Sequence, residues 1–527
     1  MATTKIGIAA VAAALLLAAT PLSAKTLKWA ADAEPGTMDP HSRNVTFTLS
    51  MLANIYEPLA RRNKDLKLEP ALATEWRSTG SDVWRYTLRR NVKFHDGSPF
   101  TADDVVFTYQ RTRGPGSLLA GVFASVKEIR KVDDFTVEFV TNGPNPILPD
   151  ELAPWLIMSK SWAEKNNAVQ ATAVSGVGDT FANRNANGTG PFVLKSREAD
   201  GKIIASANAN WWDRPEHNLT EVVFTQLQNP ATRTAALLSG DVDMVYSLPL
   251  ANVDRVAATP GYKVLRQVET RTMYFGFDVL RDELADSNVK GKNPFKDLRV
   301  RQAMQAALDV GSIQRSVMRG FSVPNFIMVG PGINGFDPSI NAPYDHNPDR
   351  GKQLMTEAGY GAGFDVNFDC SNDRWINDEQ ICVAVTAMWA RIGVRAKLRA
   401  QPFSNFVKLL SPPYETSLFM VGWSSGTYDA HNPILNLMTT RKPGSPRGLF
   451  NVGGYSNPRI DALADLIQVE LDPDKRRGFI KEALTIVKND VAYIPFHQQM
   501  VVWAAKDGIE LAQLSDNWFP YRYVRIK

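Results

Sequence analysis

Residues 88–105 of the chain read LRRNVKFHDGSPFTADDV, and this stretch predicts a strand, a turn and a helix in succession. The overlapping residues 84–89 alternate large apolar with polar side chains, which is typical of a half-buried strand. Residues 91–97 are expected to continue as a strand that ends in an Asp-Gly turn. Thr101 is then expected to cap a helix, because two acidic residues and a run of apolar residues follow it.

Within this stretch, the pair that looks most like catalytic chemistry is His95 beside Asp96. Neighbouring residues on a strand point to opposite faces, so the two side chains cannot act as a base and the group that orients it. We therefore interpret the Phe-His-Asp-Gly sequence as a structural turn that positions the helix after Thr101.

The composition around this stretch is that of a folded globular protein. The 527 residues are 44% hydrophobic and 22% charged, close to the globular average, and the length predicts about three to four domains. The net charge of +4 is too small for a nucleic-acid-binding protein, which concentrates basic residues. Two cysteines exclude a four-thiolate zinc site, and six histidines are too scattered for an obvious metal centre. No metal or cofactor is therefore expected.

The N-terminus has the pattern of a secretory signal peptide. Lys5 supplies a positive charge, residues 6–19 form an apolar run, and Pro-Leu-Ser-Ala follows at 21–24. The run is shorter than the about 20 residues that a membrane span needs. We expect cleavage after Ala24 and a soluble mature protein exported to the periplasm.

Strand-like and helix-like segments alternate along the rest of the chain, which predicts an α/β fold. Strands are expected at residues 26–30, 136–140, 222–224, 273–277 and 364–369. Helices are expected at residues 298–308, 349–358, 381–392, 458–471 and 473–488. One core does not grow past about 250–300 residues, so several cores are expected. Residues 183–190 and 286–293 are the best candidates for domain boundaries.

The two cysteines, Cys370 and Cys382, lie at the end of an expected strand and early in an expected helix. Export would bring them into an oxidising compartment, which favours a disulfide that staples the strand to the helix. Two free buried thiols are the alternative. Neither interpretation makes the cysteines catalytic.

Landmarks distributed over the whole mature chain match one family. Besides residues 88–105 they are, in order, EPGTMDP at 34–40, IYEPL at 55–59, PALA at 70–73, Trp76, GTGPF at 188–192, NPF with the following RVRQA and ALD at 293–309, YSNP at 455–458 and IPF at 494–496. With this set of motifs the chain resembles the extracytoplasmic solute-binding proteins of ABC importers, in the large three-domain class of the peptide/nickel type.

The resemblance implies an α/β, periplasmic-binding-protein-like fold with two lobes, an extra domain and a hinged cleft. Domains I and II would build one lobe and domain III the other. The expected ranges are 1–24 for the signal peptide, 25–68, 188–285 and 495–527 for domain I, 69–187 for domain II, and 286–494 for domain III.

The sequence Gly422-Trp423-Ser424-Ser425-Gly426 allows two interpretations. It fits the G-x-S-x-G nucleophile elbow, and a strand-like run precedes it, so a secreted serine hydrolase using Ser424 is one hypothesis. An elbow also needs a following helix, whereas the next residues look like a loop. The resemblance instead implies that Gly422, Trp423, Ser424 and Ser425 line the ligand cleft.

The resemblance suggests further ligand-binding candidates. Arg374, next to Trp375, could clamp a ligand carboxylate through its guanidinium fork, or it could be a surface residue held by a nearby acid. Arg271 is the other cationic candidate, with an ordinary ion pair as its alternative. Thr37 and Met38 lie in a loop that borders the ligand in the family, although Met38 could simply pack in the core.

Peptide-binding relatives often place an acidic residue shortly after the Gly-Trp pair, where it holds the ligand's amino group. This chain has Gly426 at that position, and Asp429 follows three residues later. Either Asp429 takes over the role or the ligand has no free amino terminus there. A metal-carrying role for His431 lacks partner ligands nearby in sequence.

We therefore expect a monomeric, non-enzymatic receptor that captures a peptide-like solute and delivers it to the membrane permease of an ABC importer. The alternative within the same fold is a non-peptide ligand such as an opine, a nickel chelate, an oligosaccharide or an organic acid. No nucleic acid is expected as a partner.

Overall fold

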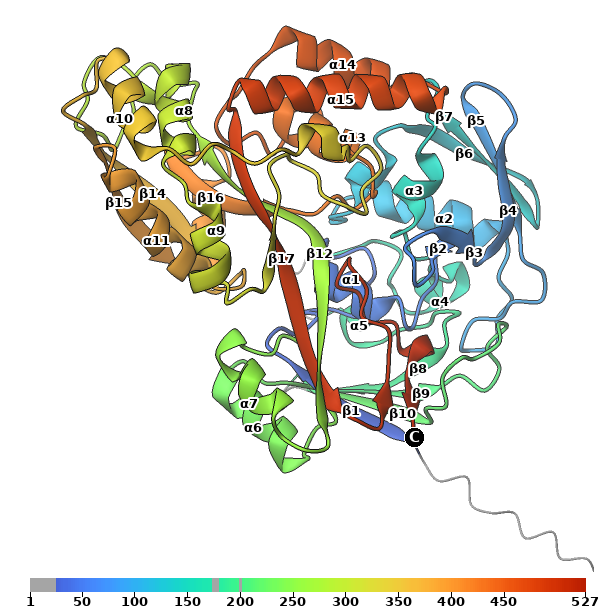
Figure 1. Cartoon of the computed structure of the whole chain (residues 1–527). Coiled ribbons are helices and arrows are strands. Elements are labelled where there is room, and N and C mark those ends of the chain that lie inside the picture. The colour runs from blue at the N-terminus through green and yellow to red at the C-terminus, as the bar shows by residue number, and fades with distance from the viewer. Residues whose placement is uncertain (1–24, 173–179, 199–200) are drawn as a thin grey trace, which may run out of the picture.

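The computed structural model describes residues 25–172, 180–198 and 201–527. The predicted signal peptide, residues 1–24, lies outside this part of the chain. Mixed α/β structure forms two lobes that share one large sheet (Figure 1). None of the helices in the described ranges is long and apolar enough to cross a bilayer.

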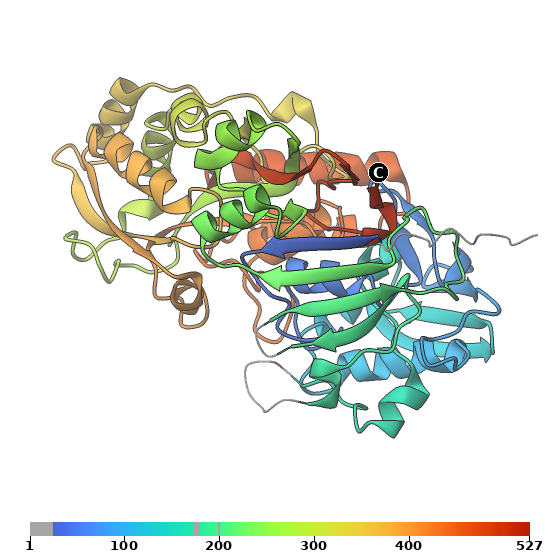
Figure 2. The same ribbon diagram turned by 90° about the horizontal axis from the view of Figure 1, so that it is seen from below.

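The large sheet has eleven strands and runs through both lobes. In spatial order its strands are β15 (Val394–Gln401), β14 (Phe364–Ser371), β16 (Leu418–Trp423), β12 (Tyr262–Phe277), β17 (Tyr493–Lys506), β11 (Met244–Val245), β1 (Thr26–Ala31), β10 (Glu221–Gln226), β9 (Ile203–Ala207) and β8 (Phe192–Arg197), with β13 (Ser322–Pro324) paired to β17. Figure 2 shows β1, β10, β9 and β8 side by side at one end of this sheet.

Three smaller sheets complete the β structure. They are a four-stranded sheet of β4 (Ala73–Ser78), β5 (Val83–Leu88), β7 (Thr136–Thr141) and β6 (Val126–Asp133), and the pairs β2 (Ala60–Arg62) with β3 (Leu68–Pro70) and β18 (Ile509–Glu510) with β19 (Arg525–Ile526).

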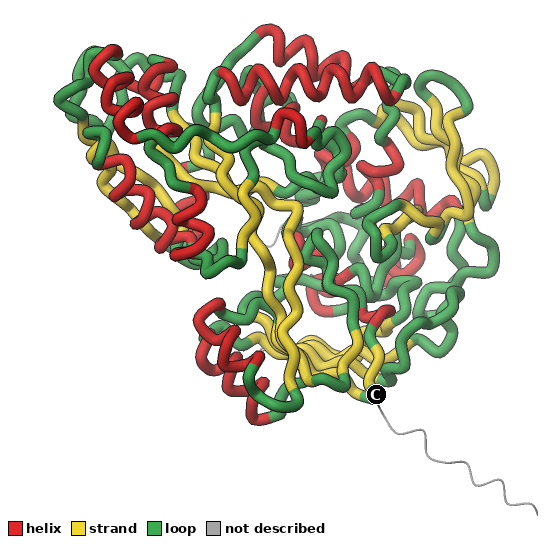
Figure 3. Tube along the Cα trace, viewed as in Figure 1, coloured by secondary structure: helices red, strands yellow, loops and turns green. Residues whose placement is uncertain are grey.

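The α-helices surround these sheets (Figure 3). They are α1 (Thr46–Leu52), α2 (Ala102–Arg113), α3 (Leu148–Leu152), α4 (Lys160–Lys165), α5 (Phe181–Arg184), α6 (Pro230–Ser239), α7 (Val253–Ala257), α8 (Leu298–Ala306), α9 (Val310–Ser312), α10 (Pro348–Glu357), α11 (Asp378–Ala390), α12 (Phe403–Leu409), α13 (His431–Pro433), α14 (Pro458–Val469) and α15 (Pro473–Asn489).

We call the part with β1, β8–β11 and the four-stranded sheet the first lobe, and the part with β14–β16, α8–α11, α14 and α15 the second lobe (Figure 1). Three large groups of buried apolar residues fill them: those around Trp29 and Phe139 lie in the first lobe, and the one around Phe275 fills the second lobe and extends to Ala30 and Val245 of the first. The several cores expected from chain length are therefore present. The domain boundaries assigned from the sequence stay a prediction.

The long antiparallel strands β12 and β17 connect the lobes. Their pairing runs from Tyr262 opposite Lys506 to Gly276 opposite Tyr493, with register shifts between Val268 and Thr272 and between Met273 and Tyr274. Residues 269–271 fall within the first shift. The strand pair is thus continuous at both ends and irregular in the middle, where the two lobes meet.

Three of the sequence landmarks meet at one junction in the first lobe. The N–H of His95 donates to the carbonyl of Gly188 (2.8 Å), and the N–H of Gly190 donates to the carbonyl of Ile55 (2.9 Å). A Cβ on Gly188 would lie 2.0 Å from the Ile55 oxygen, so only glycine fits there. The hydroxyl of Thr189 donates to the buried carboxylate of Glu57 (2.9 Å). The junction explains why these motifs need their particular residues.

The strand expected at residues 91–97 is wrong. The segment makes only an isolated bridge between Lys93 and Pro99, because it folds back on itself: Phe94 donates to Ser98 (2.8 Å) and Phe100 donates to Val92 (3.0 Å) through their backbones. The His95 ring lies 3.0 Å from the Gly190 carbonyl. The interpretation of this motif as a structural turn agrees with these contacts.

The cap expected at Thr101 is confirmed. Its side chain accepts from the N–H of Asp103, and the carboxylate of Asp104 accepts from the N–H of Thr101, which forms a capping box at the start of α2. The later expected helices are also present as α8, α10, α11, α14 and α15, with ends that differ from the expected ones by at most three residues.

His497 on β17 makes acid sensitivity a testable property of the strands between the lobes. Its ring is buried and both nitrogens lack a hydrogen-bond partner, and burial lowers its pKa to about 3. As the pH falls from about 7.5 to about 5, the unfolded chain gains a proton here and the folded chain does not, which lowers the free energy of unfolding by about 2 kcal/mol.

We expect His497→Leu to remove this loss. The free energy of unfolding, measured with urea, should therefore be higher for the variant relative to the wild type at about pH 5 than it is at about pH 7.5. The exposed His346 provides the matched control, His346→Leu. If the wild type and His497→Leu differed in their free energy of unfolding by the same amount at both pH values, the prediction would be contradicted.

Candidate functional site: the cleft between the lobes

A cleft of about 1030 Å³ lies between the two lobes. Its walls come from segments far apart in the sequence: residues 44–62, 118–125 and 142–154 of the first lobe, 422–436, 445–450 and 464–469 of the second, and the C-terminal residues 514–522. Such a site exists only when the whole chain is folded.

Six of the ten residues predicted to bind ligand line this cleft: Arg271, Arg374, Gly422, Trp423, Ser424 and Ser425. The other four, Thr37, Met38, Trp375 and Asp429, are buried and are not among the lining residues. The ligand-binding role of every one of them stays a prediction.

Arg374 is a cation in the cleft wall without a carboxylate partner in the described part of the chain. Its backbone N–H donates to Asp378 (3.1 Å), which fixes the loop, while the guanidinium lies 5.5 Å from the ring centre of Phe403. The side chain is accessible through the cleft. The walls of the cleft partly desolvate its guanidinium, which together with the nearby charge of Arg271 lowers the pKa of Arg374, while the charges of Glu269 and Asp32 oppose the shift. An incoming anion would relieve this repulsion.

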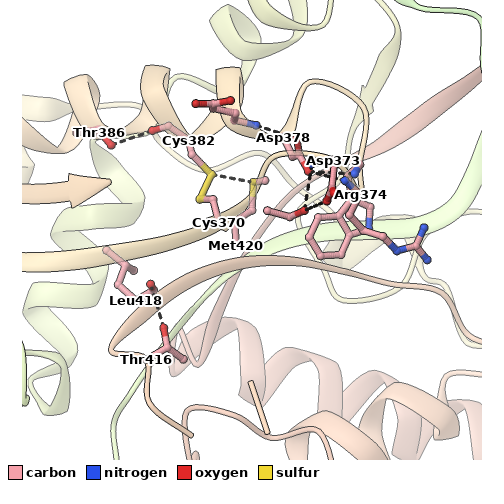
Figure 4. Close-up of a disulfide and its surroundings, with 12 residues drawn as sticks. Cys370, Asp373, Arg374, Asp378, Cys382, Thr386, Thr416, Leu418 and Met420 are labelled. Atoms are coloured by element: carbon pink, nitrogen blue, oxygen red, sulfur yellow. Dashed lines mark hydrogen bonds between the residues drawn. A yellow bond between two sulfur atoms is a disulfide. The ribbon is translucent and has the colours of Figure 1, made fainter. Parts of the chain in front are cut away.

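Cys370 and Cys382 form a disulfide, as export favours, and they enclose the loop that carries Arg374. Figure 4 shows the guanidinium of Arg374 directed away from the disulfide. The bond joins β14 to α11 with a Cα–Cα distance of 6.8 Å, and Met420 of β16 lies 3.8 Å from the Cys382 sulfur. The bond therefore anchors both ends of the Arg374 loop to the second lobe.

Arg271 is paired, which was the alternative considered from the sequence. Its Nε lies 3.2 Å from the carboxylate of the buried Glu269, and both residues sit where the β12–β17 register shifts. A Cβ on Gly422 would lie 2.9 Å from Cδ of Arg271 and 2.4 Å from Sδ of Met273. Glycine at this position lets Arg271 pack across β16 at the floor of the cleft.

Ser424 lacks the surroundings of a catalytic serine. The residues after it form turns, as expected, and not the helix of a nucleophile elbow. Its hydroxyl lies 3.3 Å from the hydroxyl of Thr270, and none of the described histidines forms a hydrogen bond with it. The serine hydrolase hypothesis thus gains no support from the geometry.

Asp429, the acid suggested as a substitute at Gly426, is engaged elsewhere. Its two carboxylate oxygens lie 2.7 and 2.8 Å from the guanidinium of Arg476, and one also accepts from Asn334 (2.7 Å). A buried bidentate ion pair of this kind leaves no charge for a ligand.

Thr37 and Met38 are held against another loop. The Thr37 hydroxyl donates to the side chain of Asn183 (2.8 Å), and the Met38 N–H donates to the Asn183 carbonyl (3.0 Å). Met38 packs in the core around Trp29. Core packing of Met38 was the alternative that the sequence left open.

Two acids in the cleft wall, Glu151 and Asp516, were not recognised from the sequence. Glu151 accepts from Asn145 (2.7 Å) and Ser125 (3.0 Å), and burial raises its pKa to about 7. Burial also raises the pKa of Asp516, which accepts from the hydroxyl of Tyr428. No local motif marks either acid as a cleft residue, because the walls of the cleft come from segments far apart in the sequence.

Arg62 and Tyr428 form a contact across the cleft. The guanidinium carbon of Arg62 lies 3.9 Å from the ring centre of Tyr428, and Arg62 donates to the Thr427 carbonyl (3.2 Å) and to Asp150 (2.7 Å). Tyr428 has a φ of 57°, which is unfavourable for a non-glycine residue and directs its backbone into this contact. The two lobes are therefore in direct contact here.

His431 also lines the cleft, but it is buried, and burial lowers its pKa to about 4. In the described ranges there is no group of three or more His, Cys, Asp or Glu side chains placed to hold a metal ion.

Two lobes joined by long strands, with a polar and apolar cleft between them, define a class of protein that encloses a small solute. The family model described as "Bacterial extracellular solute-binding proteins, family 5 Middle" matches residues 67–445. The chain belongs to this family.

Relatives at low identity cover nearly the whole chain. The periplasmic murein peptide-binding protein MppA of Escherichia coli (strain K12) is 24% identical over 88% of this chain and 86% of its own length. Heme-binding protein A of Haemophilus influenzae is 26% identical over 81% and 78%. The structure of the periplasmic binding protein DppA from Helicobacter pylori with the peptide STSA matches with a TM-score of 0.79, 24% identity, and coverage of 95% of this chain and 98% of that chain.

Reduction of the disulfide should destabilise the second lobe. A closed loop of this size contributes about 3 kcal/mol in the chain-entropy model, so we expect a reductant to lower the thermal midpoint of the wild type. The double variant Cys370→Ala/Cys382→Ala should unfold at the reduced midpoint with or without reductant. Equal midpoints for oxidised and reduced wild type would show that the bond contributes nothing.

Arg62→Gln should loosen the closed arrangement of the lobes. It removes the cation–π contact and a charge-assisted hydrogen bond, together worth about 1–2 kcal/mol. We expect a larger radius of gyration in small-angle scattering without ligand. The control, Arg90→Gln, removes an Arg–Phe contact (4.4 Å, to Phe135) within the first lobe and should leave the radius unchanged; equal radii for both variants would contradict this role.

Proposed function

We propose that this protein is a periplasmic receptor that closes around a peptide-like solute and presents it to the permease of an ABC importer. The observation that carries the proposal is Arg374, a guanidinium in the cleft wall that forms no ion pair within the described part of the chain. A solute carboxylate would supply that partner through bidentate hydrogen bonds.

Capture of this kind is binding without chemical change. A ligand shifts the lobes toward closure only if it makes contacts in the closed form that the open form lacks. Arg271 and Arg374 on the second lobe, with residues 44–62 and 142–154 on the first, offer such contacts from both sides. We propose that the protein works as a monomer, without nucleic acid, after export and cleavage of its signal peptide near Ala24.

A non-peptide solute is the second candidate, and one observation favours it. Gly426 stands where peptide-binding relatives often carry an acid, and Asp429 is already paired with Arg476. The relatives themselves are named for different ligands, a murein peptide and heme. A free amino group is therefore not the feature that this cleft is best built to recognise.

Isothermal titration with di- and tripeptides, combined with small-angle scattering, tests the main proposal. We expect at least one peptide to release or absorb heat and to compact the protein, and Arg374→Gln to weaken its affinity by at least about tenfold, the loss of a charged hydrogen bond. The control Arg395→Gln removes a surface arginine paired with Asp365. No heat from any peptide and no compaction by any solute would overturn the proposal.

A further inference from the structure

The cleft exposes large apolar side chains that a soluble protein ordinarily covers. Leu118, Leu449, Phe450 and Val469 are 51%, 52%, 49% and 41% exposed, and all four line the cleft. Isolated exposed apolar residues need no explanation, but several gathered in one concave site indicate a binding surface.

These side chains face the cleft from both lobes. Leu118 follows α2 in the first lobe, whereas Leu449, Phe450 and Val469 belong to the second. The loop that carries Phe450 is held in place, because the N–H of Phe450 donates to the Asn436 carbonyl (2.9 Å) and that of Gly448 donates to Leu435 (2.9 Å). The apolar surface is thus presented on fixed backbone.

Trp423 extends this surface with its aromatic ring. Its indole N–H already donates to the side chain of Asn432 (2.9 Å), so the polar edge of the ring is satisfied. Its ring centre lies 5.1 Å from that of Phe450. The two rings can therefore offer mainly apolar contact to a solute.

The polar part of the same cleft carries Arg374, a positive charge that forms no ion pair in the described ranges, close to the β12 irregularity. Arg271 and Arg374 lie close enough for the charge of Arg271 to lower the pKa of Arg374, and of the two only Arg271 has a carboxylate partner in the described ranges, Glu269. An anion is the group that this pair lacks.

We propose that the solute is an organic anion with a bulky apolar body. This inference rests on the proposed function and narrows its ligand. The anionic group pairs with Arg374, and the apolar body lies against Leu118, Trp423, Leu449 and Phe450. A free amino terminus is not required, because Gly426 supplies no carboxylate after the Gly-Trp pair and Asp429 is taken by Arg476.

Closure explains why the apolar contacts come from two lobes. A bulky body that touches Leu118 on one side and Phe450 on the other loses water-exposed apolar area on both sides only when the lobes meet. The apolar body therefore supplies the difference in affinity between the open and closed forms that capture requires.

Calorimetry with matched probes tests the inference. We expect N-acetyl-Leu-Phe to bind at least about tenfold more tightly than N-acetyl-Gly-Gly, and N-acetyl-Leu-Phe-amide, which lacks the carboxylate, to lose at least as much. The naphthalene dye 8-anilinonaphthalene-1-sulfonate is the non-peptide anion. Comparing its affinity with that of N-acetyl-Leu-Phe shows whether the cleft prefers a peptide or a non-peptide anion.

Phe450→Ser should weaken binding of N-acetyl-Leu-Phe by about tenfold, with an unchanged thermal midpoint. The control is Leu471→Ser, since Leu471 is 56% exposed and does not line the cleft. Equal affinity for the Leu-Phe and Gly-Gly compounds, or equal affinity of wild type and Phe450→Ser, overturns the inference.

The same titrations separate this inference from the proposed function. If unblocked polar peptides bind and compact the protein while the apolar anions do not, the apolar-anion inference is wrong and the receptor function stands. If no peptide gives heat and no solute of either kind compacts the protein, the receptor function fails as well.

Discussion

The pairing of β12 with β17 holds both lobes in one sheet, and the site lies where this pairing is irregular. At both ends the two strands are in register with their neighbours, but residues 269–271 fall within a shift. Glu269 and Arg271 leave the regular ladder at that point, and Thr270 instead donates its N–H to the Ser515 carbonyl (2.8 Å). The break in the strand pairing and the charged residues of the cleft are therefore located in the same few residues.

Some of the charged residues around this point form ion pairs and one does not, and the unpaired charge is available to a solute in the cleft. Arg271 has Glu269, and Asp429 has Arg476. Arg374 alone among these residues has no charged partner in the described part of the chain, although the disulfide and Asp378 hold its loop in place. Because the backbone of this loop is already held in place, ordering it costs little further entropy on binding, so more of the interaction energy appears as affinity.

Much of the fold could be predicted from local pattern, whereas the site could be predicted only in part. Thr101 predicts a helix cap, and the apolar periodicity of residues 458–471 and 473–488 predicts α14 and α15. These signals can be recognised because they depend only on neighbours in the sequence. Residues 91–97 do not form the expected strand, because the segment folds back on itself and His95 bonds to the distant Gly188. Glu151 and Phe450 gave no signal, because only folding brings them to one cavity.

The first strand of the protein can pair with its neighbours in the sheet only after almost the entire chain is available. β1 pairs with β10, whose register places Thr26 opposite Glu221, and with β11, which in turn needs β17 near the C-terminus. Lys25 even donates to the carbonyl of Ile526 (2.6 Å). Loop closure over such sequence separations is slow. A chain threaded N-terminus first through a translocation channel would thus remain unable to complete its first lobe until its last residues had emerged.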